Sequence, residues 1–456
     1  MRKTSRQSQS TIPITLLLII AVARATQDKC SIYTAPSSIK GITGLGIYTT
    51  RDINVGDPIL KGGADGAIPI LDPNNATQHY FSLLLDTFRN THWWSNGAGD
   101  FNFIAAQDAI DVQVTCGALP NHHCLLASME HVYPATAAYD DSMALRHSSP
   151  GTGAFSYGAG REFYATQPIA AGHEVFFEEV PCDGKTNEKY FEWQSHIPLD
   201  RDFVTAARMV QQMWNRVDDK DPDKLLGWDV LISNYDSHKP LVTLLPQTKR
   251  ELQQIMQQVA DASSSKNQDE KNDNKNDALS LIARQLAFHA LEQRSVAWIQ
   301  QHGLCLENLV RKPSVLPHAG YGGFAHFDIA AGDVITPSPM IHLDKQSMHI
   351  LNDKGQVVGH QLLLNYALSH ADSEIILIPN TNAILINHCS NRSADLAQHC
   401  PDGPNAAFTW PDDDDDTHEW LNPPEWRNLT AAQVLSMSKR GIGMQVVALR
   451  DIAKGM

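Results

Sequence analysis

The chain has 456 residues, 42% of them hydrophobic, and a formal net charge of −15. This length predicts two or three domains rather than one core, and the apolar content excludes general disorder. The acidic balance argues against nucleic-acid binding, which needs a basic surface. We therefore expect a protein substrate or partner and no nucleic acid. Five consecutive aspartates at 412–416 are typical of a solvated loop.

The N-terminus has the features of a secretory signal peptide. Basic residues precede a short apolar segment at 12–23, and Ala23 and Ala25 have the small-x-small spacing of a cleavage site. Twelve apolar residues are fewer than the roughly 20 needed to span a bilayer. The sequence predicts a signal peptide over residues 1–25 and a protein of the secretory pathway or the extracellular space, with no membrane contact after cleavage. A signal anchor is the alternative.

The predicted compartment allows disulfide bonds between the cysteines. No two of them form a C-x-x-C pair, their pairing cannot be read from spacing, and an odd count leaves one thiol over. The seven cysteines are Cys30, Cys116, Cys124, Cys182, Cys305, Cys389 and Cys400. Asn75, Asn391 and Asn428 begin Asn-x-Ser/Thr triplets and are glycosylation candidates.

Residues 26–182 are expected to form a first, mostly β domain. Its apolar segments are short and separated by glycine and asparagine turns, as in residues 41–60. A helical segment over 183–302 follows, and residues 263–276 are polar and predict a disordered loop within it. A second domain starts near residue 303 and continues to residue 456. The predicted fold class is therefore α+β, mostly β with a helical insert.

Three helices are expected between the two domains. Apolar residues recur at helical spacing over 203–214 and 252–259, and Thr248 and Glu251 have the spacing of a capping box. A third helix is predicted over 277–301, because its apolar residues share one face and a glycine at 303 can end it. We expect these helices to pack the two domains together.

The most informative pattern is a repeat. Residues 43–59 return as residues 319–335, with glycines, aspartates and isoleucines in register, and residues 165–172 return as 448–455. Between these blocks, Asn121-His122 is matched by Asn387-His388. Three matches in the same order indicate a duplicated domain.

Both copies resemble the SET domain, the fold of one large class of protein-lysine methyltransferases. The resemblance rests on the glycine-rich opening, the Asn-His block and the closing Ile-Ala-x-Gly block. It implies a protein-lysine methyltransferase that uses S-adenosylmethionine. In that family, the glycine backbone and the Asn-His block contact the cofactor. The implied cofactor-binding positions are Gly44, Leu45, Gly46, Asn121 and His122 in the first copy and Gly320, Tyr321, Gly322, Asn387 and His388 in the second.

Each motif also has a structural interpretation. A glycine pair serves a tight turn as readily as a ligand. A buried Asn-His pair can hold the crossing of two chain segments by hydrogen bonds, without any catalysis. Metal binding is a third interpretation for His122, His123, Cys124 and His131, although their spacing matches no standard zinc pattern.

The catalytic residue is unknown from the sequence. The family closes with an acid-aromatic-acid-tyrosine segment whose tyrosine orients the substrate amine. Glu179 stands at that position in the first copy, and in the second copy the position lies beyond Met456. Loss of methyl transfer is therefore expected in the first copy. Tyr366 is interpreted as a core aromatic, with a lysine channel as the alternative.

Two functions remain open. The first is a protein-lysine methyltransferase whose second copy is active. The second is a secreted, non-catalytic SET-like protein-binding module, which a glycan on Asn391 would favour because it would crowd a cofactor beside Asn387. A hydrolase has no support, because neither G-x-S-x-G nor H-E-x-x-H occurs.

Overall fold

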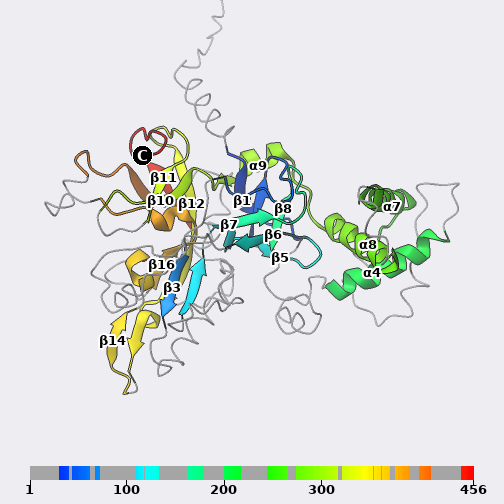
Figure 1. Ribbon diagram of the computed structural model, residues 1–456, viewed down its shortest axis with the longest axis horizontal. Coiled ribbons are helices and arrows are strands. Elements are labelled where there is room, and N and C mark those ends of the chain that lie inside the picture. The colour runs from blue at the N-terminus through cyan, green and yellow to red at the C-terminus, as the bar shows by residue number, and fades with distance from the viewer. Residues whose placement is uncertain are drawn as a thin grey trace, which may run out of the picture.

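The computed structural model of the chain is rich in strands, with a group of helices in its middle (Figure 1). It describes residues 30–40, 44–61, 67–71, 109–113, 115–117, 119–132, 162–177, 200–216, 228, 244–264, 274–316, 321–352, 354–360, 362–369, 375–389, 400–411 and 443–456. The fold is α+β and mostly β, as the sequence predicted.

The first repeat forms a mixed sheet with the order β7-β6-β8-β2-β1-β9, and β5 pairs with β8 beside this path. The strands are β1 (Ile32–Pro36), β2 (Leu45–Thr49), β5 (Asn121–His122), β6 (Ala127–Val132), β7 (Glu162–Ala165), β8 (Glu174–Phe177) and β9 (Leu304–Cys305). Strand β8 lies between antiparallel β2 and parallel β5 and β6. A separate hairpin pairs β3 (Ala67–Leu71) with β4 (Ala109–Gln113).

Strand β9 belongs to the first sheet, although the sequence places it just inside the second domain. Its Cys305 lies opposite Tyr33 of β1, and a disulfide bond joins Cys305 to Cys30. Glu307 extends this contact, because its buried carboxylate accepts hydrogen bonds from the backbone N–H and hydroxyl of Ser31. The chain therefore returns to the first repeat before it starts the second.

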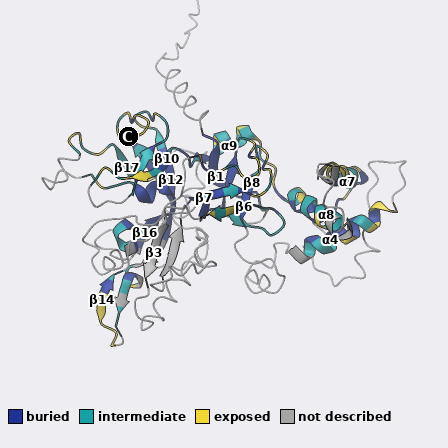
Figure 2. Cartoon of the chain, viewed as in Figure 1, coloured by how far each residue is buried: buried dark blue, intermediate teal, exposed yellow. Residues whose placement is uncertain are grey.

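The second repeat forms a five-stranded sheet with the order β15-β16-β12-β18-β17 and two hairpins. The sheet strands are β12 (Val334–Asp344), β15 (Leu368–Ser369), β16 (Ile375–Pro379), β17 (Ala406–Thr409) and β18 (Gly443–Ala448). The hairpins are β10 (Leu309–Pro313) with β11 (Tyr321–Ala325), and β13 (His349–Leu351) with β14 (Val357–His360). The second of these carries exposed apolar side chains at Val357 and Val358 (Figure 2).

The two repeats fold alike at the matching residues. Pro36 lies opposite Leu45 in the first hairpin, and Pro313 lies opposite Tyr321 in the second. Beyond each hairpin an isolated antiparallel bridge joins two isoleucines, Ile53 with Ile169 and Ile329 with Ile452. Glycines 56, 172, 332 and 455 all have positive φ, between 82° and 94°, a conformation that glycine adopts without steric cost.

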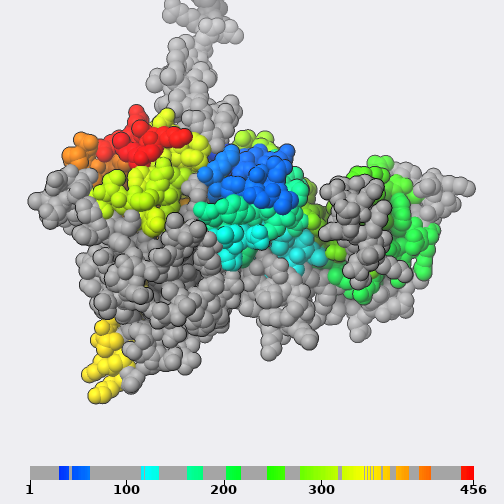
Figure 3. Space-filling view, viewed as in Figure 1, coloured from blue at the N-terminus to red at the C-terminus, as the bar shows by residue number. Residues whose placement is uncertain are grey.

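One hydrophobic core extends across both repeats. Ile47 and Val175 of the first sheet belong to the same buried cluster as Ile341, Ile378 and Leu385 of the second repeat. Complete burial of such side chains contributes about 1.5–3 kcal/mol each. Tyr366 belongs to this cluster and is 8% exposed. It is therefore a core aromatic, as the sequence analysis interpreted it. The repeats therefore contact each other directly (Figure 3).

The helices pack against the first repeat rather than between the two. They are α4 (Asp200–Trp214), α7 (Lys249–Ser264), α8 (Asn274–Ala290) and α9 (Val296–His302). In the described residues, the cluster around α4, α7 and α8 includes Leu126 and Phe176 of the first repeat and no residue beyond Leu291. The expectation that helices join the two domains is wrong, because the β cores supply that contact themselves. In Figure 1, α4, α7 and α8 extend to the side away from the second repeat, whereas α9 lies beside β1.

The third predicted helix is two helices. The chain leaves α8 at residue 290, Leu291 makes a β-bridge with Ile39, and the N–H of Glu292 donates to the carbonyl of Ser38 at 2.8 Å. Ser295 then caps α9 by accepting from the N–H of Trp298 at 3.1 Å, and Gly303 ends it as predicted. Pairing with the first repeat outweighs the helical periodicity.

Two further sequence predictions on the helices can be compared with the structure. The capping box is confirmed, because the N–H of Glu251 donates to Thr248 Oγ1 at 3.2 Å and the N–H of Thr248 donates back to the Glu251 carboxylate. The predicted loop 263–276 is too long, since α7 runs to Ser264 and α8 begins at Asn274.

The cysteines form disulfide bonds, as the sequence allowed. Cys30 bonds Cys305, Cys389 bonds Cys400, and Cys124 is also disulfide-bonded. Cys116 is buried and retains its thiol. In the described part of the chain, no helix is both long and apolar enough to cross a lipid bilayer. The predicted signal peptide lies outside the described residues.

Candidate functional site

The glycine pair of the first repeat lies against a buried carboxylate. Gly46 is in β2, and Glu174 begins the adjacent strand β8 opposite Tyr48. A Cβ on Gly46 would lie 2.1 Å from Glu174 Oε1. Glycine is therefore required here because the Glu174 side chain fills the space above the strand.

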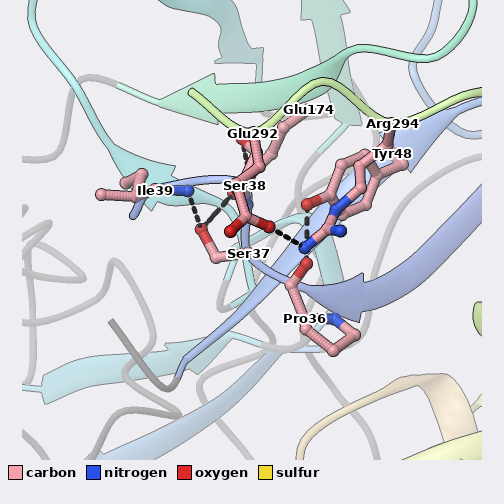
Figure 4. Close-up of polar contacts among 8 residues, drawn as sticks. All are labelled: Pro36, Ser37, Ser38, Ile39, Tyr48, Glu174, Glu292 and Arg294. Carbon is pink, nitrogen blue, oxygen red and sulfur yellow. Dashed lines mark hydrogen bonds and ion pairs between the residues drawn. The ribbon is translucent and has the colours of Figure 1, made fainter. Parts of the chain in front are cut away.

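Four donor groups hold the Glu174 carboxylate, which is 4% exposed. The N–H and hydroxyl of Ser38 donate at 2.6 and 2.5 Å, the Ser37 hydroxyl at 3.1 Å, and Asn121 Nδ2 at 2.6 Å. Asn121 Nδ2 also donates to the carbonyl of Leu45 at 2.9 Å. The carboxylate thus joins the turn after β1, the glycine strand and the Asn-His block. Figure 4 shows Glu174 beside Ser37 and Ser38 of that turn.

Burial dominates the electrostatics of this cluster. It raises the pKa of Glu174, while the hydrogen bonds from Ser38, Asn121 and Ser37 act in the opposite direction. Burial also raises the pKa of Tyr48, and the neighbouring Glu174 adds to that shift. The Tyr48 hydroxyl therefore stays protonated and donates to the carbonyl of Pro36 at 2.7 Å.

Arg294 ties the α8–α9 connection to this cluster. Its guanidinium pairs with Glu292 and lies 4.0 Å from the ring centre of Trp298. Figure 4 shows Arg294 beside Tyr48 and Glu292. An open cavity lies where the α8–α9 connection meets the first sheet. It is lined by residues of both, including His173, Glu174 and Arg294. Because charges of both signs line it, the cavity has no clear preference for an anion or a cation.

The second repeat has the same asparagine hydrogen bonds, but a different side chain lies nearest to its glycine. Asn387 Nδ2 donates to Ser314 Oγ at 3.1 Å and to the carbonyl of Tyr321 at 3.4 Å, as Asn121 does to Ser37 and Leu45. A Cβ on Gly322 would lie 2.9 Å from Asn387 Nδ2. The asparagine side chain therefore occupies the space that the carboxylate fills in the first repeat.

The histidines of the two Asn-His blocks have different surroundings. His122 is partly buried, and burial lowers its pKa to about 4, whereas His388 is exposed. His123, the residue after this block, packs against two phenylalanine rings. Its ring centroid lies 5.6 Å from that of Phe176 and 5.5 Å from that of Phe203 in α4. Burial, with a smaller contribution from His122, lowers the pKa of His123 to about 3. His123 is a neutral contact between the first sheet and the helices.

We expect His123 to make the protein less stable in acid. Between pH 6.5 and pH 3 the unfolded state binds a proton at this position and the folded state does not, so stability falls as the pH falls. The loss between pH 7 and pH 5 is about 2 kcal/mol for this one group. His123→Phe keeps a ring between Phe176 and Phe203 and should remove that part of the pH dependence, measured by urea denaturation at both pH values.

The matched control for this experiment is His388→Phe, which changes an exposed histidine. It should leave the difference in unfolding free energy between pH 7 and pH 5 unchanged. A His123→Phe protein with the same pH dependence as the parent would show that His123 does not resist protonation.

The structure brings most of the predicted site residues together within each repeat. Leu45, Gly46, Asn121 and His122 meet in the first, and Tyr321, Gly322, Asn387 and His388 gather in the second. Gly44 begins the same turn, where its carbonyl accepts from the N–H of Ser37 at 3.0 Å. Gly320, Glu179, Asn75, Asn391 and Asn428 lie outside the described residues.

The metal interpretation is not supported by the geometry. Cys124 is disulfide-bonded, which removes the thiolate that a metal would bind. Over the residues that the structure describes, no group of three or more histidine, cysteine or acidic side chains has a suitable arrangement.

Sequence reasoning missed the serines that complete each site. Ser37 follows Pro36 and Ser314 follows Pro313, each just before the turn that leads to the glycine pair. This Pro-Ser recurrence was the available signal. Glu174 follows the closing block at residues 165–172, and its contact with Gly46 cannot be read from spacing.

The first repeat does not fit S-adenosylmethionine as the resemblance implies. The Glu174 side chain covers Gly46, and the Asn121 amide is engaged by Glu174, Ser37 and Leu45. In the second repeat, a Cβ on Gly322 would lie 2.9 Å from Asn387, 3.3 Å from Phe324 and 3.7 Å from Ser314. The backbone of Tyr321–Gly323 and the Asn387 amide are the groups that could hold a cofactor there.

No protein-family model matches this chain, and no curated protein matches it.

Proposed function

We propose that this chain is a non-catalytic SET-like protein of the secretory pathway that binds other proteins. The observation that carries the proposal is the buried Glu174 carboxylate, which lies against Gly46 and accepts from Asn121. A family site would use this glycine backbone and this amide for S-adenosylmethionine. In the first repeat both are used to hold the fold together.

The compartment supports the same function. A chain that passes through the secretory pathway is suited to disulfide bonds, and Cys30–Cys305 and Cys389–Cys400 are such bonds. The N-terminal sequence has the pattern of a signal peptide. Two β repeats that contain disulfide bonds and share one core form a scaffold that presents loops and strand edges to partners.

A second candidate is a protein-lysine methyltransferase whose second repeat is active. It is favoured by the surroundings of Gly322 in the described residues, where the nearest neighbour is the neutral Asn387 side chain. Tyr321, Asn387 and the exposed His388 lie beside it. The backbone there would bind the cofactor, and the cofactor would supply the methyl group.

Calorimetric titration with S-adenosylmethionine separates the two candidates. We expect no saturable heat from the full chain, because Glu174 covers one glycine pair and Asn387 covers the other. Asn387→Ala and Asn121→Ala are the informative variants, and their circular dichroism should first show that both are folded. Saturable binding that Asn387→Ala weakens and Asn121→Ala leaves intact would refute the proposal and establish the methyltransferase candidate.

A further inference from the structure

Two histidines lie opposite each other in a hairpin of the second repeat. His349 of β13 is the register partner of His360 of β14. Their ring centroids are 5.1 Å apart, and the ring planes meet at 79°. Directly opposite residues of an antiparallel pair carry their side chains on the same face. The pairing therefore holds two imidazoles side by side.

The shared core fixes the base of this hairpin. Met348, directly before His349, and Leu363, shortly after His360, are completely buried and belong to the cluster that spans both repeats. The two histidines are half-buried, whereas Val357, nearer the tip, is exposed. The histidine pair thus lies where the strands leave the core. Side chains anchored in this way lose little freedom when they bind a ligand.

A β-bulge beside the pair sets the register of the two strands. Ile350 lies opposite Gly359 and Leu351 lies opposite Val357, so that Val358 is the extra residue. Bulges pin the register of a hairpin and are frequent next to functional sites. A slip by one residue would place the two histidines on opposite faces of the hairpin.

The distance between the rings suits one metal ion bound by both. Zn²⁺ binds imidazole nitrogen at about 2.0–2.1 Å, so two nitrogens at a tetrahedral angle lie about 3.3 Å apart and their ring centres about 5 Å apart. The centroids of His349 and His360 are 5.1 Å apart. Rotation about the Cβ–Cγ bond is a soft motion that turns a ring and leaves its centre nearly in place. A nitrogen of each ring can therefore face the same ion while both strands keep their positions.

The type of ligand selects the type of metal. Imidazole nitrogen suits Zn²⁺, Cu²⁺ and Ni²⁺, whereas Ca²⁺ and Mg²⁺ take oxygen ligands. Within the part of the chain that the structure describes, no third histidine, cysteine or acidic side chain completes a metal-binding group with this pair. Water would fill the remaining positions, and the ion would stay open to a further ligand.

We propose that His349 and His360 form a binding site for a divalent transition metal of the Zn²⁺ type, which links β13 to β14. These two strands form a sheet of their own, and a two-stranded hairpin is marginally stable in water. In Figure 1 the hairpin projects from the second repeat, on the side away from β10 and β11. The site is separate from both glycine sites, so it does not depend on the proposed binding function.

The first test measures hydrogen exchange of the full chain, freed of metal with a chelator, before and after addition of ZnCl₂. The amides of His349–Leu351 and Val357–His360 should exchange at least about tenfold more slowly with Zn²⁺, because opening of the hairpin would break a metal–nitrogen bond. The amides of Ala406–Thr409 in β17 are the internal control and should exchange at an unchanged rate. This comparison uses the parent chain alone and needs no variant.

Two variants separate metal binding from the contact between the rings. His349→Phe and His360→Phe each keep an aromatic ring in the pair and remove the ligand nitrogen. Loss of an outer-shell partner already lowers metal affinity about 10–100-fold, so loss of a ligand should lower the Zn²⁺ affinity at least about tenfold, measured by calorimetric titration. The matched control is His302→Phe, which changes a histidine that packs on the ring of Trp298 at 4.9 Å and should leave the affinity unchanged.

Three results would overturn the inference. One is exchange in β13 and β14 that ZnCl₂ does not slow. Another is a Zn²⁺ affinity that His349→Phe and His360→Phe leave as it is in the parent, which would place the bound ion elsewhere on the chain. The third is an affinity that only one of the two variants lowers, which would mean that a single histidine binds the ion and that the hairpin is not bridged.

Discussion

Replacing Glu174 with alanine is expected to lower the free energy of unfolding by about 3–5 kcal/mol, one of the two largest effects of a change in this protein. The reason is the loss of a buried acceptor. Both the N–H and the hydroxyl of Ser38 would be left without their partner, and Asn121 Nδ2 would lose its shortest hydrogen bond. Urea denaturation of the purified variant and the parent at pH 7 measures this loss.

The control is Glu292, a second acidic residue, which lies in the connection between α8 and α9. Glu292 pairs with Arg294, but its side chain is 47% exposed, so Glu292→Ala should cost less than about 1 kcal/mol. Equal losses from Glu174→Ala and Glu292→Ala would show that the buried network does not hold the first repeat together.

Glu174→Gln tests the sign of the charge effect. Burial raises the pKa of Glu174 in the folded state, so the parent loses stability as the pH rises through that pKa. Glutamine carries no charge, so the Glu174→Gln protein does not lose stability in this way as the pH rises. The stability of Glu174→Gln relative to the parent should therefore increase as the pH rises from 5 to 8.

Removing the Cys30–Cys305 disulfide bond with paired serine substitutions should cost about 3–5 kcal/mol. The two cysteines are 275 residues apart in sequence, so the bond restricts a very long loop of the unfolded chain. It also holds β9 beside β1, where only two residue pairs form the ladder. The measurement is urea denaturation of the double-serine variant under non-reducing conditions.

The Cys389–Cys400 bond provides the control for loop length. Its cysteines are 11 residues apart, and its removal by the same substitutions should cost about 3 kcal/mol less than removal of Cys30–Cys305. If the two double-serine variants are equally stable, the long-range bond does not contribute through chain entropy.

Local patterns were reliable where the physical cause is local. The capping box at Thr248 and Glu251 and the end of α9 at Gly303 depend on hydrogen bonds within a few residues, and both are present. The predicted helix over 277–301 failed because Leu291 and Glu292 bond to Ser38 and Ile39, far away in sequence. Periodicity cannot report a partner at that distance.

In the candidate site too, some features were predicted from the sequence and the long-range contacts were not. The resemblance grouped Gly46 with Asn121 and Gly322 with Asn387 as cofactor-binding positions, and the structure brings each pair together. What fills the space between them differs in the two repeats, and no spacing rule predicts it. The carboxylate of Glu174 reaches Gly46 because β8 pairs with β2, which is a long-range event.

The sequence by itself determined the duplication, the mostly β class, the helical middle and the glycine and Asn-His residues of each site, because repetition and short-range hydrogen bonding follow from the order of residues. Only the tertiary structure decided that the repeats share one core, that the helices pack on the first repeat alone in the described residues, and that Glu174 covers one glycine pair. These outcomes depend on which surfaces meet, and burial and strand pairing between distant segments set that choice.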